Sequence, residues 1–335
     1  MMKFLRYLLL PVVPVYYLVT WLRNILYDFG IKKSTSYTFP VICVGNLSVG
    51  GTGKSPMIEY LIRLLKSEYH LATLSRGYKR QTEGFVIADE NASASSIGDE
   101  PFQFYQKFDN IIVSVDSDRV HGISQLTDVP NPPEIILLDD AFQHRKVKAG
   151  FNILLTAFDD LYTEDILLPT GNLREPRQGA KRADIIVVTK CPENLSEERK
   201  QQITNDINPL AHQEVFFGRI AYAKSVRNNG NQLDLETLEN RPFTLVTGIA
   251  NPKPLVDHLK SLGLQFEHLK FKDHHDFNET DIAILKQKPL LVTTEKDMVR
   301  LQPHFNESGS LYYLPIEIRM DRQAQFDTLI SNFIK

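Results

Sequence analysis

A glycine-rich stretch between an apolar run and a helix-like segment carries the clearest chemical signal in the chain. The apolar residues 40–44 lead into Gly45-Asn46-Leu47-Ser48-Val49-Gly50-Gly51-Thr52-Gly53-Lys54-Ser55-Pro56, and residues 57–65 have a helical pattern. Glycines let backbone N–H groups surround a phosphate, and the N-terminus of the following helix adds positive potential. Lys54 is then expected to reach the β- and γ-phosphates, and the Ser55 hydroxyl to bind Mg²⁺. The pattern predicts a nucleotide site formed by residues 46 and 48–55.

This loop departs from the usual phosphate-loop pattern at two positions. Ser48 stands where a glycine is common, and Val49 stands where a related group of ATPases has a lysine. The competing interpretation is a glycine-rich turn that only joins a strand to a helix. The combination of strand, loop, Lys54 and helix favours the nucleotide site.

Acidic residues follow another apolar run and are candidates for the metal side of such a site. Residues 135–138 are apolar and lead into Asp139 and Asp140. A buried strand that ends in a carboxylate is how phosphate-loop enzymes hold Mg²⁺ opposite the loop hydroxyl. A simple turn after the strand is the alternative. Further along, Arg174 and Arg177 lie in a turn-rich stretch and are candidates to neutralise phosphate charge.

Asp99 stands directly before an aromatic, helix-like segment, within Gly98-Asp99-Glu100-Pro101. An aspartate in this place commonly caps the helix. The same carboxylate could act as a general base that faces the transferred phosphate. Spacing alone favours the cap.

Two motifs in the last third of the chain contain acidic residues. Residues 273–276 read Asp-His-His-Asp, and all four are of metal-ligand type. Adjacent residues on an extended chain point in opposite directions, so the two histidines are poorly placed to bind one ion. The other interpretations are a single histidine that supports a catalytic carboxylate and a solvated turn. Residues 295–297 read Glu-Lys-Asp, and no chemical role follows from their pattern.

Composition excludes several classes of function. The chain has 335 residues, which favours two domains, and 42% hydrophobic residues, which suffice for a full core. A formal net charge of -3 argues against general nucleic-acid binding. The two cysteines, Cys43 and Cys191, offer neither a disulfide framework nor metal-ligand spacing, which fits a reducing compartment.

Residues 1–30 differ in character from the rest of the chain. No formal charge occurs in residues 7–22, and aromatic and cationic residues gather at the edges of this run. That pattern is typical of a membrane interface. The short length, together with Pro11 and Pro14, favours a helix that lies on the membrane over one that crosses it. The alternatives are a signal peptide and a buried N-terminal helix.

Apolar runs that alternate with helical patterns predict an α/β fold with a mostly parallel sheet. We expect strands at 40–44, 70–74, 110–115, 135–138, 151–157, 183–189, 243–246, 264–271 and 290–292, and helices at 57–65, 102–108 and 254–262. Residues 81–98 are expected to be exposed. Polar stretches between residues 190 and 240 predict a boundary, so the expected units are an N-terminal segment at 1–30, a phosphate-loop core at 31–220 and a smaller α/β domain at 221–335.

Taken together and in order, the motifs resemble the tetraacyldisaccharide 4'-kinase family, whose members phosphorylate the lipid A disaccharide precursor at the inner membrane. The resemblance covers nearly the whole chain. The resemblance rests on the apolar N-terminus and on the motifs at 45–56, 75–78, 98–101, 138–144, 173–176, 248–252, 273–274 and 294–297. The family usually has threonine in place of Ser55, which keeps the hydroxyl, and glycine in place of Ala141, which exchanges two small residues.

The resemblance implies a kinase that uses ATP and Mg²⁺ to phosphorylate the 4'-hydroxyl of tetraacyldisaccharide 1-phosphate, forming lipid IVA at the cytoplasmic face of the inner membrane. It implies that Asp99 is the base and that His274 orients or tunes it, which reverses the preference for a cap. Lys54 and Arg174 complete the implied catalytic set, and Ser55, Asp139, Asp140 and Glu175 form the implied Mg²⁺ site. Residues implied in substrate binding are Arg76, Tyr78, Arg119, Gln143 and His144.

The resemblance also implies that Asp99 and His274 lie on different domains, so that domain closure assembles the site and excludes water. A second hypothesis, from another class of function, is a phosphate-loop ATPase that serves as an assembly factor or chaperone and phosphorylates no sugar.

Overall fold

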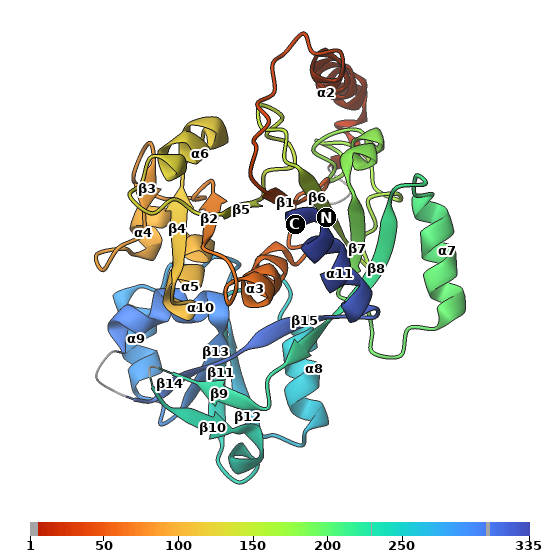
Figure 1. Ribbon diagram of the computed structural model, residues 1–335. Helices are drawn as coiled ribbons and strands as arrows, with labels where there is room; N and C mark the ends of the chain where they lie inside the picture. Colours follow the sequence, from red (N-terminus) through yellow and green to blue (C-terminus); the bar gives the residue numbers. More distant parts are fainter. Residues whose placement is uncertain (1–5, 229, 306–308) are drawn as a thin grey trace.

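The computed structural model describes residues 6–228, 230–305 and 309–335, and these form two β-sheets covered by helices (Figure 1). The first five residues of the predicted membrane segment lie outside the described residues. The expected α/β fold with a large, mostly parallel sheet is confirmed.

The first sheet has nine strands in the order β15-β8-β7-β6-β1-β5-β2-β4-β3. Neighbouring strands run parallel except at the two edges, where β3 pairs antiparallel with β4 and β15 with β8. The strands are β1 (Val41–Asn46), β2 (Leu71–Ser75), β3 (Val86–Ile87), β4 (Ile111–Val115), β5 (Ile135–Asp139), β6 (Phe151–Ala157), β7 (Ile185–Thr189), β8 (Glu214–Tyr222) and β15 (Ile316–Met320).

Apolar side chains cover both faces of this sheet. In β1, Ile42 and Val44 join one core cluster and Val41 and Cys43 join the other, as the alternation of a strand requires. Helices α3 (Lys54–Leu65), α4 (Ala94–Ile97), α5 (Asp99–Lys107) and α11 (Gln323–Ile334) contribute to the first cluster, and α6 (Arg119–Thr127) and α7 (Glu197–Ile207) to the second. Because central strands are buried on both faces, they read as continuous apolar runs in the sequence.

The second sheet has six strands in the order β10-β9-β14-β13-β11-β12. Pairing is parallel from β14 to β12 and antiparallel at β9 and β10. The strands are β9 (Ser225–Arg227), β10 (Gln232–Asp234), β11 (Phe243–Thr247), β12 (Phe266–Lys270), β13 (Leu291–Thr294) and β14 (Leu311–Leu314). Helix α8 (Lys253–Ser261) packs into one core cluster, and α9 (Glu279–Lys286) and α10 (Glu295–Leu301) pack into another. Short 3-10 helices are η1 (Leu10–Val12), η2 (Arg177–Arg182), η3 (Leu235–Leu238) and η4 (Gln302–His304).

The end of the chain returns to the first sheet. The sequence-based division assigned all of residues 221–335 to the second domain, whereas β15 pairs with β8 and Phe326 of α11 packs into the core beneath α3. A strand near the C-terminus gives no local sign of the sheet it will join. The division of the chain into domains stays a prediction, and residues 316–334 lie with the first sheet.

Residues 81–98 are less exposed than expected. They contain the short strand β3 and helix α4, and Ile97 of α4 is fully buried in the core cluster that also contains α3. Single apolar residues in a polar stretch give a weak periodic signal, which explains the miss.

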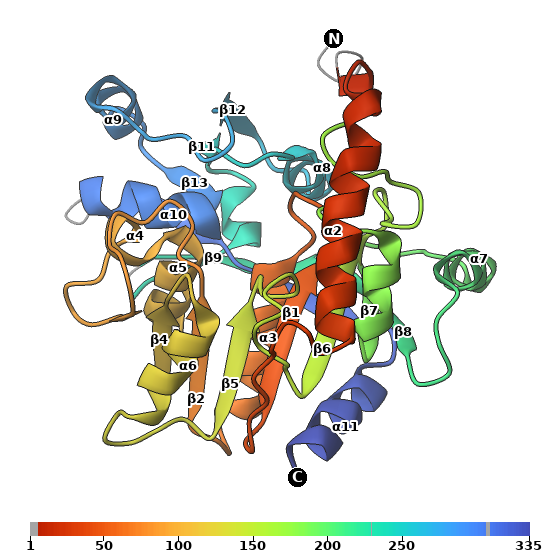
Figure 2. The ribbon, with the colours of Figure 1, turned by 90° about the horizontal axis from the view of Figure 1, so that it is seen from above.

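Helix α2 (Val13–Asp28) follows η1 and lies outside both sheets, and in Figure 2 its N-terminal end projects at the edge of the molecule. Val15, Leu18, Val19 and Leu22 recur at helical spacing and are all exposed. The opposite face packs on the chain, where Asn24 is buried. Within the described ranges, no helix is both long enough and apolar enough to cross a bilayer.

Candidate active site

The phosphate loop connects β1 to α3, as the sequence predicts. Gly50 has a φ of 117° and Gly53 a φ of 86°, conformations that residues with a Cβ rarely adopt. Gly53 precedes Lys54, the first residue of α3. Hydrogen bonds from other segments fix the loop, among them Val49 N to Asn172 O at 2.8 Å, Arg174 N to Leu47 O at 2.8 Å, and Thr189 Oγ1 to Thr52 O at 2.7 Å.

Four predicted site residues meet beside this loop. Lys54 Nζ lies 3.8 Å from Asp140 Oδ1 and 3.4 Å from Asn46 Oδ1. Arg174 uses both terminal nitrogens on Asp140, at 3.0 and 3.3 Å, and donates to Asn46 Oδ1 at 2.6 Å. Two cations thus face one carboxylate at the mouth of the loop, which is the charge pattern that a polyphosphate requires. Arg177 instead is exposed and donates to the carbonyl of Asp165.

Strand pairing explains how Asp139 and Asp140 reach the loop. Asp139, at the end of β5, is in register with Val44 of the neighbouring parallel strand β1, so both strands end at the same edge of the sheet. The carboxylate of Asp139 is buried, its Oδ2 accepts from Ser75 Oγ at 3.3 Å, and its Oδ1 has no hydrogen-bond partner in the described part of the chain.

Burial, and next the charge of Asp140, raise the pKa of Asp139 to about 6. Burial would also raise the pKa of Asp140, but Lys54 and Arg174 outweigh burial and hold it below its usual range. A buried carboxylate oxygen without a hydrogen-bond donor, next to a second carboxylate and close to the helix that begins Lys54-Ser55, fits a hard divalent cation such as Mg²⁺. Phosphate oxygens and water would have to complete the ligand set.

Glu175 lies behind these residues and is only 1% exposed. Its Oε1 accepts from Gln143 Nε2 at 3.0 Å and from Arg182 Nη2 at 2.8 Å, and its Oε2 accepts from Asn24 Nδ2 at 2.7 Å. Both oxygens are therefore engaged, and a metal ion would have to displace one of these donors. The geometry instead favours a role in holding Gln143, whose amide also donates to Asn46 O at 2.8 Å.

Asp99 and His274 come together across the two sheets. Asp99 is the first residue of α5, and Gly98, not Asp99, occupies the N-cap position, with no side-chain cap bond. The cap that spacing favoured is therefore wrong. Instead, Asp99 Oδ2 lies 3.2 Å from His274 Nδ1, and His274 is held at a φ of 53° in the turn after β12. The charge of Glu100, the neighbour of Asp99, contributes to the raised pKa of Asp139, so this pair and the metal-side carboxylates share one region.

The two adjacent histidines serve different partners. His275 Nε2 hydrogen-bonds Asp281 Oδ2 at 2.8 Å, and its ring stacks on Phe271 with centroids 4.8 Å apart. No cluster of three or more His, Cys, Asp or Glu side chains in the described ranges is arranged to hold a metal ion. His275 therefore stabilises the turn that presents His274.

Two of the residues predicted to bind substrate are exposed, two are half-buried and one is buried. Arg76 and Tyr78 are exposed, and the Tyr78 ring centroid lies 6.5 Å from that of His274, so the loop after β2 borders the Asp99–His274 pair. His144 is half-buried and lies 3.6 Å from Asp118 Oδ1. Gln143 contacts Arg174 Nη1 at 3.3 Å and belongs to the site beside the phosphate loop.

Arg119 is placed differently from its prediction. The side chain is 2% exposed, and its guanidinium donates to the backbone carbonyls of Asp116, Ser117 and Asp139. Direct contact with a bulky lipid substrate would require exposure that this residue lacks. Because Arg119 lies beneath Asp139, its charge stabilises the ionised carboxylates of the metal side.

Sequence reasoning missed three residues that complete this region. Lys190 donates to the Gly51 carbonyl in the phosphate loop. Arg300 of α10 approaches Asp99, with Nε 3.4 Å from Oδ2. Asn24 of α2 binds Glu175, as described above. Each contact joins residues more than 100 positions apart, so no local pattern could have revealed it.

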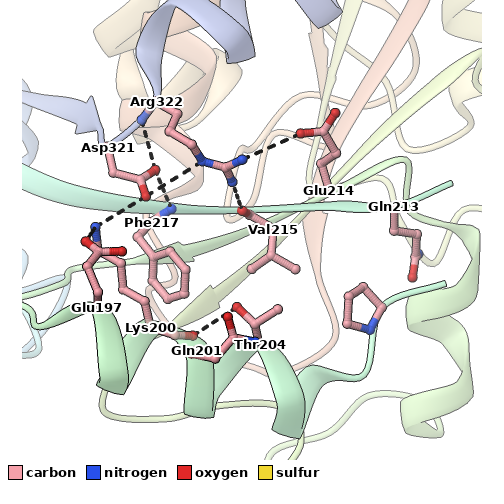
Figure 3. A pocket seen from close by; sticks show the side chains of 11 residues that line it. Glu197, Lys200, Gln201, Thr204, Gln213, Glu214, Val215, Phe217, Asp321 and Arg322 are labelled. Carbon is pink, nitrogen blue, oxygen red and sulfur yellow. Dashed lines mark hydrogen bonds and ion pairs between the residues drawn. The ribbon is translucent and has the colours of Figure 1, made fainter. Parts of the chain in front are cut away.

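A separate pocket of about 520 Å³ lies between α7, β8 and the start of α11 (Figure 3). Its cations are already paired: Lys200 with Glu197 at 2.8 Å, and Arg322 with Glu214 at 3.8 Å. This pocket contains none of the residues described above and is not the candidate active site.

Comparison with known proteins places the chain in a family. The family model described as tetraacyldisaccharide-1-P 4'-kinase matches residues 5–335. The chain belongs to the tetraacyldisaccharide 4'-kinase family. Tetraacyldisaccharide 4'-kinases of Flavobacterium johnsoniae and Bacteroides thetaiotaomicron are 52% and 43% identical to it, over 100% and 98% of this chain and 98% and 93% of theirs. A crystal structure of the family member LpxK from Aquifex aeolicus in complex with ATP superposes with a TM-score of 0.80 at 30% identity, covering 99% of this chain and 100% of that one.

The comparisons cover the kinase family's full length, so they concern both sheets and the N-terminal helix together. The resemblance seen in the sequence is thereby confirmed at the level of the family and the fold. The roles of individual residues rest on the geometry described above.

Proposed function

We propose that the protein transfers the γ-phosphate of ATP to the 4'-hydroxyl of tetraacyldisaccharide 1-phosphate. The observation that carries this proposal is the assembly of two separate groups in one member of the tetraacyldisaccharide 4'-kinase family. One group is the phosphate loop with Lys54, Asp140 and Arg174, and the other is the Asp99–His274 pair. The first group suits a triphosphate, and the second suits a hydroxyl that must lose a proton.

Asp99 acts as the base in this proposal. As the sugar oxygen forms its bond to the γ-phosphorus, its proton passes to Asp99 while the bond between the γ-phosphorus and the β–γ bridging oxygen breaks and ADP leaves. Both His274 and Arg300 approach Oδ2, and in the described part of the chain no hydrogen bond or ion pair reaches Oδ1. Oδ1 is therefore the oxygen that accepts the proton, and the His274 N–H fixes the orientation of the carboxylate.

Charge neutralisation falls to the other group. Lys54 and Arg174 both pair with Asp140 in this structure. The oxygens of a bound phosphate would compete with Asp140 for these two cations. Ser55, Asp139 and Asp140 would hold Mg²⁺, and Asp139 is suited to this because its buried Oδ1 accepts no hydrogen bond from the described residues. When bound, Mg²⁺ supplies charge neutralisation on the phosphate oxygens. The backbone N–H groups of Gly50, Gly51 and Gly53 would orient the phosphates for an in-line transfer, whereas the N–H groups of Val49 and Thr52 already donate to the carbonyls of Asn172 and Gly50.

Helix α2 is the membrane-contacting element in this proposal. Its stripe of Val15, Leu18, Val19 and Leu22 faces away from the chain, and Leu8 and Leu9 extend the exposed apolar surface. The other side of the helix reaches the active site, since Tyr16 donates to Arg174 O at 2.8 Å. The helix lies on the cytoplasmic face of the inner membrane and brings the site to the headgroups of the glycolipid.

The proposal is tested by ATP turnover in mixed micelles, with and without tetraacyldisaccharide 1-phosphate. Turnover that depends on the lipid, with label moving from ATP to the lipid, supports the kinase. ATP hydrolysis that ignores the lipid but responds to a protein partner would support the alternative, an assembly-factor ATPase. Family membership favours the kinase.

The membrane role of α2 has its own test. Replacing Leu18 and Leu22 by serine should weaken vesicle binding, and unchanged binding would show that α2 is not the membrane-contacting element.

A further inference from the structure

Helix α10 begins with the residues to which the sequence pattern assigned no role. Thr294 caps the helix by accepting from Asp297 N at 3.1 Å. The helix packs against α5, the helix that begins with Asp99 (Figures 1 and 2). Lys296 Nζ lies 2.9 Å from Glu100 Oε1, and Glu295 pairs with Lys107 at the other end of α5. Successive charges on α10 thus pair with opposite charges on α5.

Arg300 forms the third of these cross-helix pairs and is the one that reaches the base. Its Nε lies 3.4 Å from Asp99 Oδ2, its Nη2 lies 3.3 Å from Asp297 Oδ1, and its Nη1 donates to the carbonyl of His275 at 2.8 Å. The side chain is 10% exposed. The contacts with Asp99 and Asp297 are ion pairs without hydrogen-bond geometry, and the bond to His275 is a hydrogen bond, so charge and that bond together place the guanidinium between the two carboxylates and the turn that carries His274.

Asp297 anchors this arginine. It is fully buried, and its Oδ2 accepts from Gly248 N at 2.9 Å and from Thr294 Oγ1 at 2.7 Å. A Cβ on Gly248 would lie 2.9 Å from Asp297 Oδ1, so the approach leaves no room for a larger residue. With Oδ2 fixed by two donors, Oδ1 faces Arg300. A buried carboxylate in this setting gives the flexible arginine side chain one preferred position.

The groups that face Asp99 set its electrostatics. They are His274 from the turn after β12, Arg300 and Lys296 from α10, and Glu100 from α5 itself. Burial alone would raise the pKa of Asp99, but the hydrogen bond from His274 and the charges of Arg300, His274 and Lys296 outweigh burial and lower it. A lowered pKa keeps the base ionised at neutral pH.

We propose that Arg300 is a positioning residue for the base: held by Asp297, it fixes the Asp99 carboxylate through Oδ2 and turns Oδ1 toward the acceptor hydroxyl. This inference rests on the proposed phosphoryl transfer. Because α10 packs with the second sheet and α5 with the first, the base is oriented only when the two sides are in contact. Glu295, Lys296 and Asp297 thereby gain a role, which is to join α10 to α5 and to hold Arg300.

The experiment compares Arg300→Gln with Arg300→Lys and measures kcat/KM for the lipid between pH 5 and pH 9. Arg300→Gln should lower kcat/KM at neutral pH by about tenfold or more, which is less than the loss of the base itself, and should move the acid limb to higher pH. Arg300→Lys keeps the charge and should restore most of the loss. A matched control is Arg319→Gln, which removes an exposed arginine paired with Glu317.

A double-mutant cycle separates positioning from a structural role. If Arg300 acts through Asp99, Arg300→Gln should cost little further activity in an Asp99→Ala background. A purely structural tie would lower the thermal midpoint, cost the same factor in both backgrounds and leave the acid limb unmoved, and that result would overturn the inference.

The inference can be tested apart from the proposed function. Titration of the Asp99 carboxyl carbon by NMR, in protein labelled at aspartate and assigned with Asp99→Asn, needs no substrate. Its pKa should rise in Arg300→Gln and stay near the wild-type value in Arg300→Lys. An unchanged titration in Arg300→Gln contradicts the inference, whereas failure of the wild type to phosphorylate the lipid contradicts only the proposed function.

Discussion

The amide of Asn24 lies 2.7 Å from Glu175 Oε2 and joins the N-terminal helix to the network behind the phosphate loop. Glu175 in turn accepts a hydrogen bond from the side-chain amide of Gln143, and the same amide donates to the carbonyl of Asn46 in the phosphate loop. The helix with the exposed apolar stripe is therefore part of the active-site scaffold as well as a surface element.

Asn24→Ala is expected to destabilise the protein and to slow the reaction. The substitution removes a buried hydrogen bond to a carboxylate, which is worth about 2 kcal/mol, and should lower the thermal midpoint by roughly 4 °C. Calorimetry and kcat at saturating ATP measure the two effects. The matched control is Asn205→Ala on α7, where the amide is exposed and its oxygen accepts from Gln201 Nε2. Equal midpoints for both variants would show that the α2 contact carries no energy.

Arg174→Lys keeps the positive charge but loses the two-pronged contact with Asp140. A lysine cannot bind this carboxylate and Asn46 Oδ1 at the same time in the same geometry. We expect kcat to fall about 100-fold while the Kd for ATP changes less than tenfold. The control is Arg177→Lys in the same segment, which should change kcat by less than about twofold because Arg177 is exposed. Similar losses in both would contradict the assignment of Arg174.

Asp139→Asn should make the folded protein more stable at pH 8 and weaken its use of Mg²⁺. Because burial and Asp140 raise the pKa of Asp139 to about 6, the folded state binds this proton more tightly than the unfolded state does. The contribution of Asp139 to stability therefore falls as pH rises from about 4 to about 6 and stays lost above that range. At pH 8, without Mg²⁺, the variant should melt a few degrees above the wild type, and its Mg²⁺ requirement should rise about tenfold or more.

The control for that pair of measurements is Asp109→Asn, which neutralises an exposed aspartate. It should leave both the melting temperature and the Mg²⁺ dependence close to wild type. A lower melting temperature for Asp139→Asn at pH 8, with the usual Mg²⁺ requirement, would remove Asp139 from the metal side.

Glu295→Gln should flatten the pH dependence of stability. Glu295 is buried beside Glu59, and burial together with that second carboxylate raises its pKa, although Lys107 pairs with both. The folded state thus holds the proton more tightly, and the contribution of Glu295 to stability falls as pH rises from the ordinary pKa of a glutamate through the raised pKa of the folded state. Melting temperatures at pH 5 and pH 8 should therefore differ less in Glu295→Gln than in the wild type. The exposed Glu90→Gln serves as the control, and an identical difference in all three proteins would contradict this interpretation.

Short sequence patterns correctly predicted the phosphate loop and the acidic end of β5. The strand, loop and helix around Lys54 are contiguous, and the acidic end of β5 lies beside β1 because parallel strands share an edge. The resemblance, not the spacing, indicated the Asp99–His274 contact, since these residues are 175 positions apart. The Asp99–His274 contact forms where the two sheets meet, and no short sequence pattern predicts such a meeting.

The residues whose roles the sequence did not reveal all have roles that depend on which side chains from other elements cover or contact them. Arg119 and Glu175 have the right types for substrate and metal contacts, but their neighbours in space cover them. Asn24 and Arg300 were missed because a lone asparagine in an apolar helix and an arginine near the end of a short helix have no distinctive spacing. Their roles follow from partners on other elements.

Phosphate transfer by Asp99→Asn, compared with the wild type, tests the central claim most directly. Both proteins are saturated with γ-labelled ATP and mixed with tetraacyldisaccharide 1-phosphate in micelles, and label on the 4'-oxygen is followed through one turnover. We predict rapid transfer by the wild type and a loss of about 100-fold or more in the variant, with ATP affinity unchanged. Equal transfer by both proteins, or ATP consumption without labelled lipid, would contradict the account.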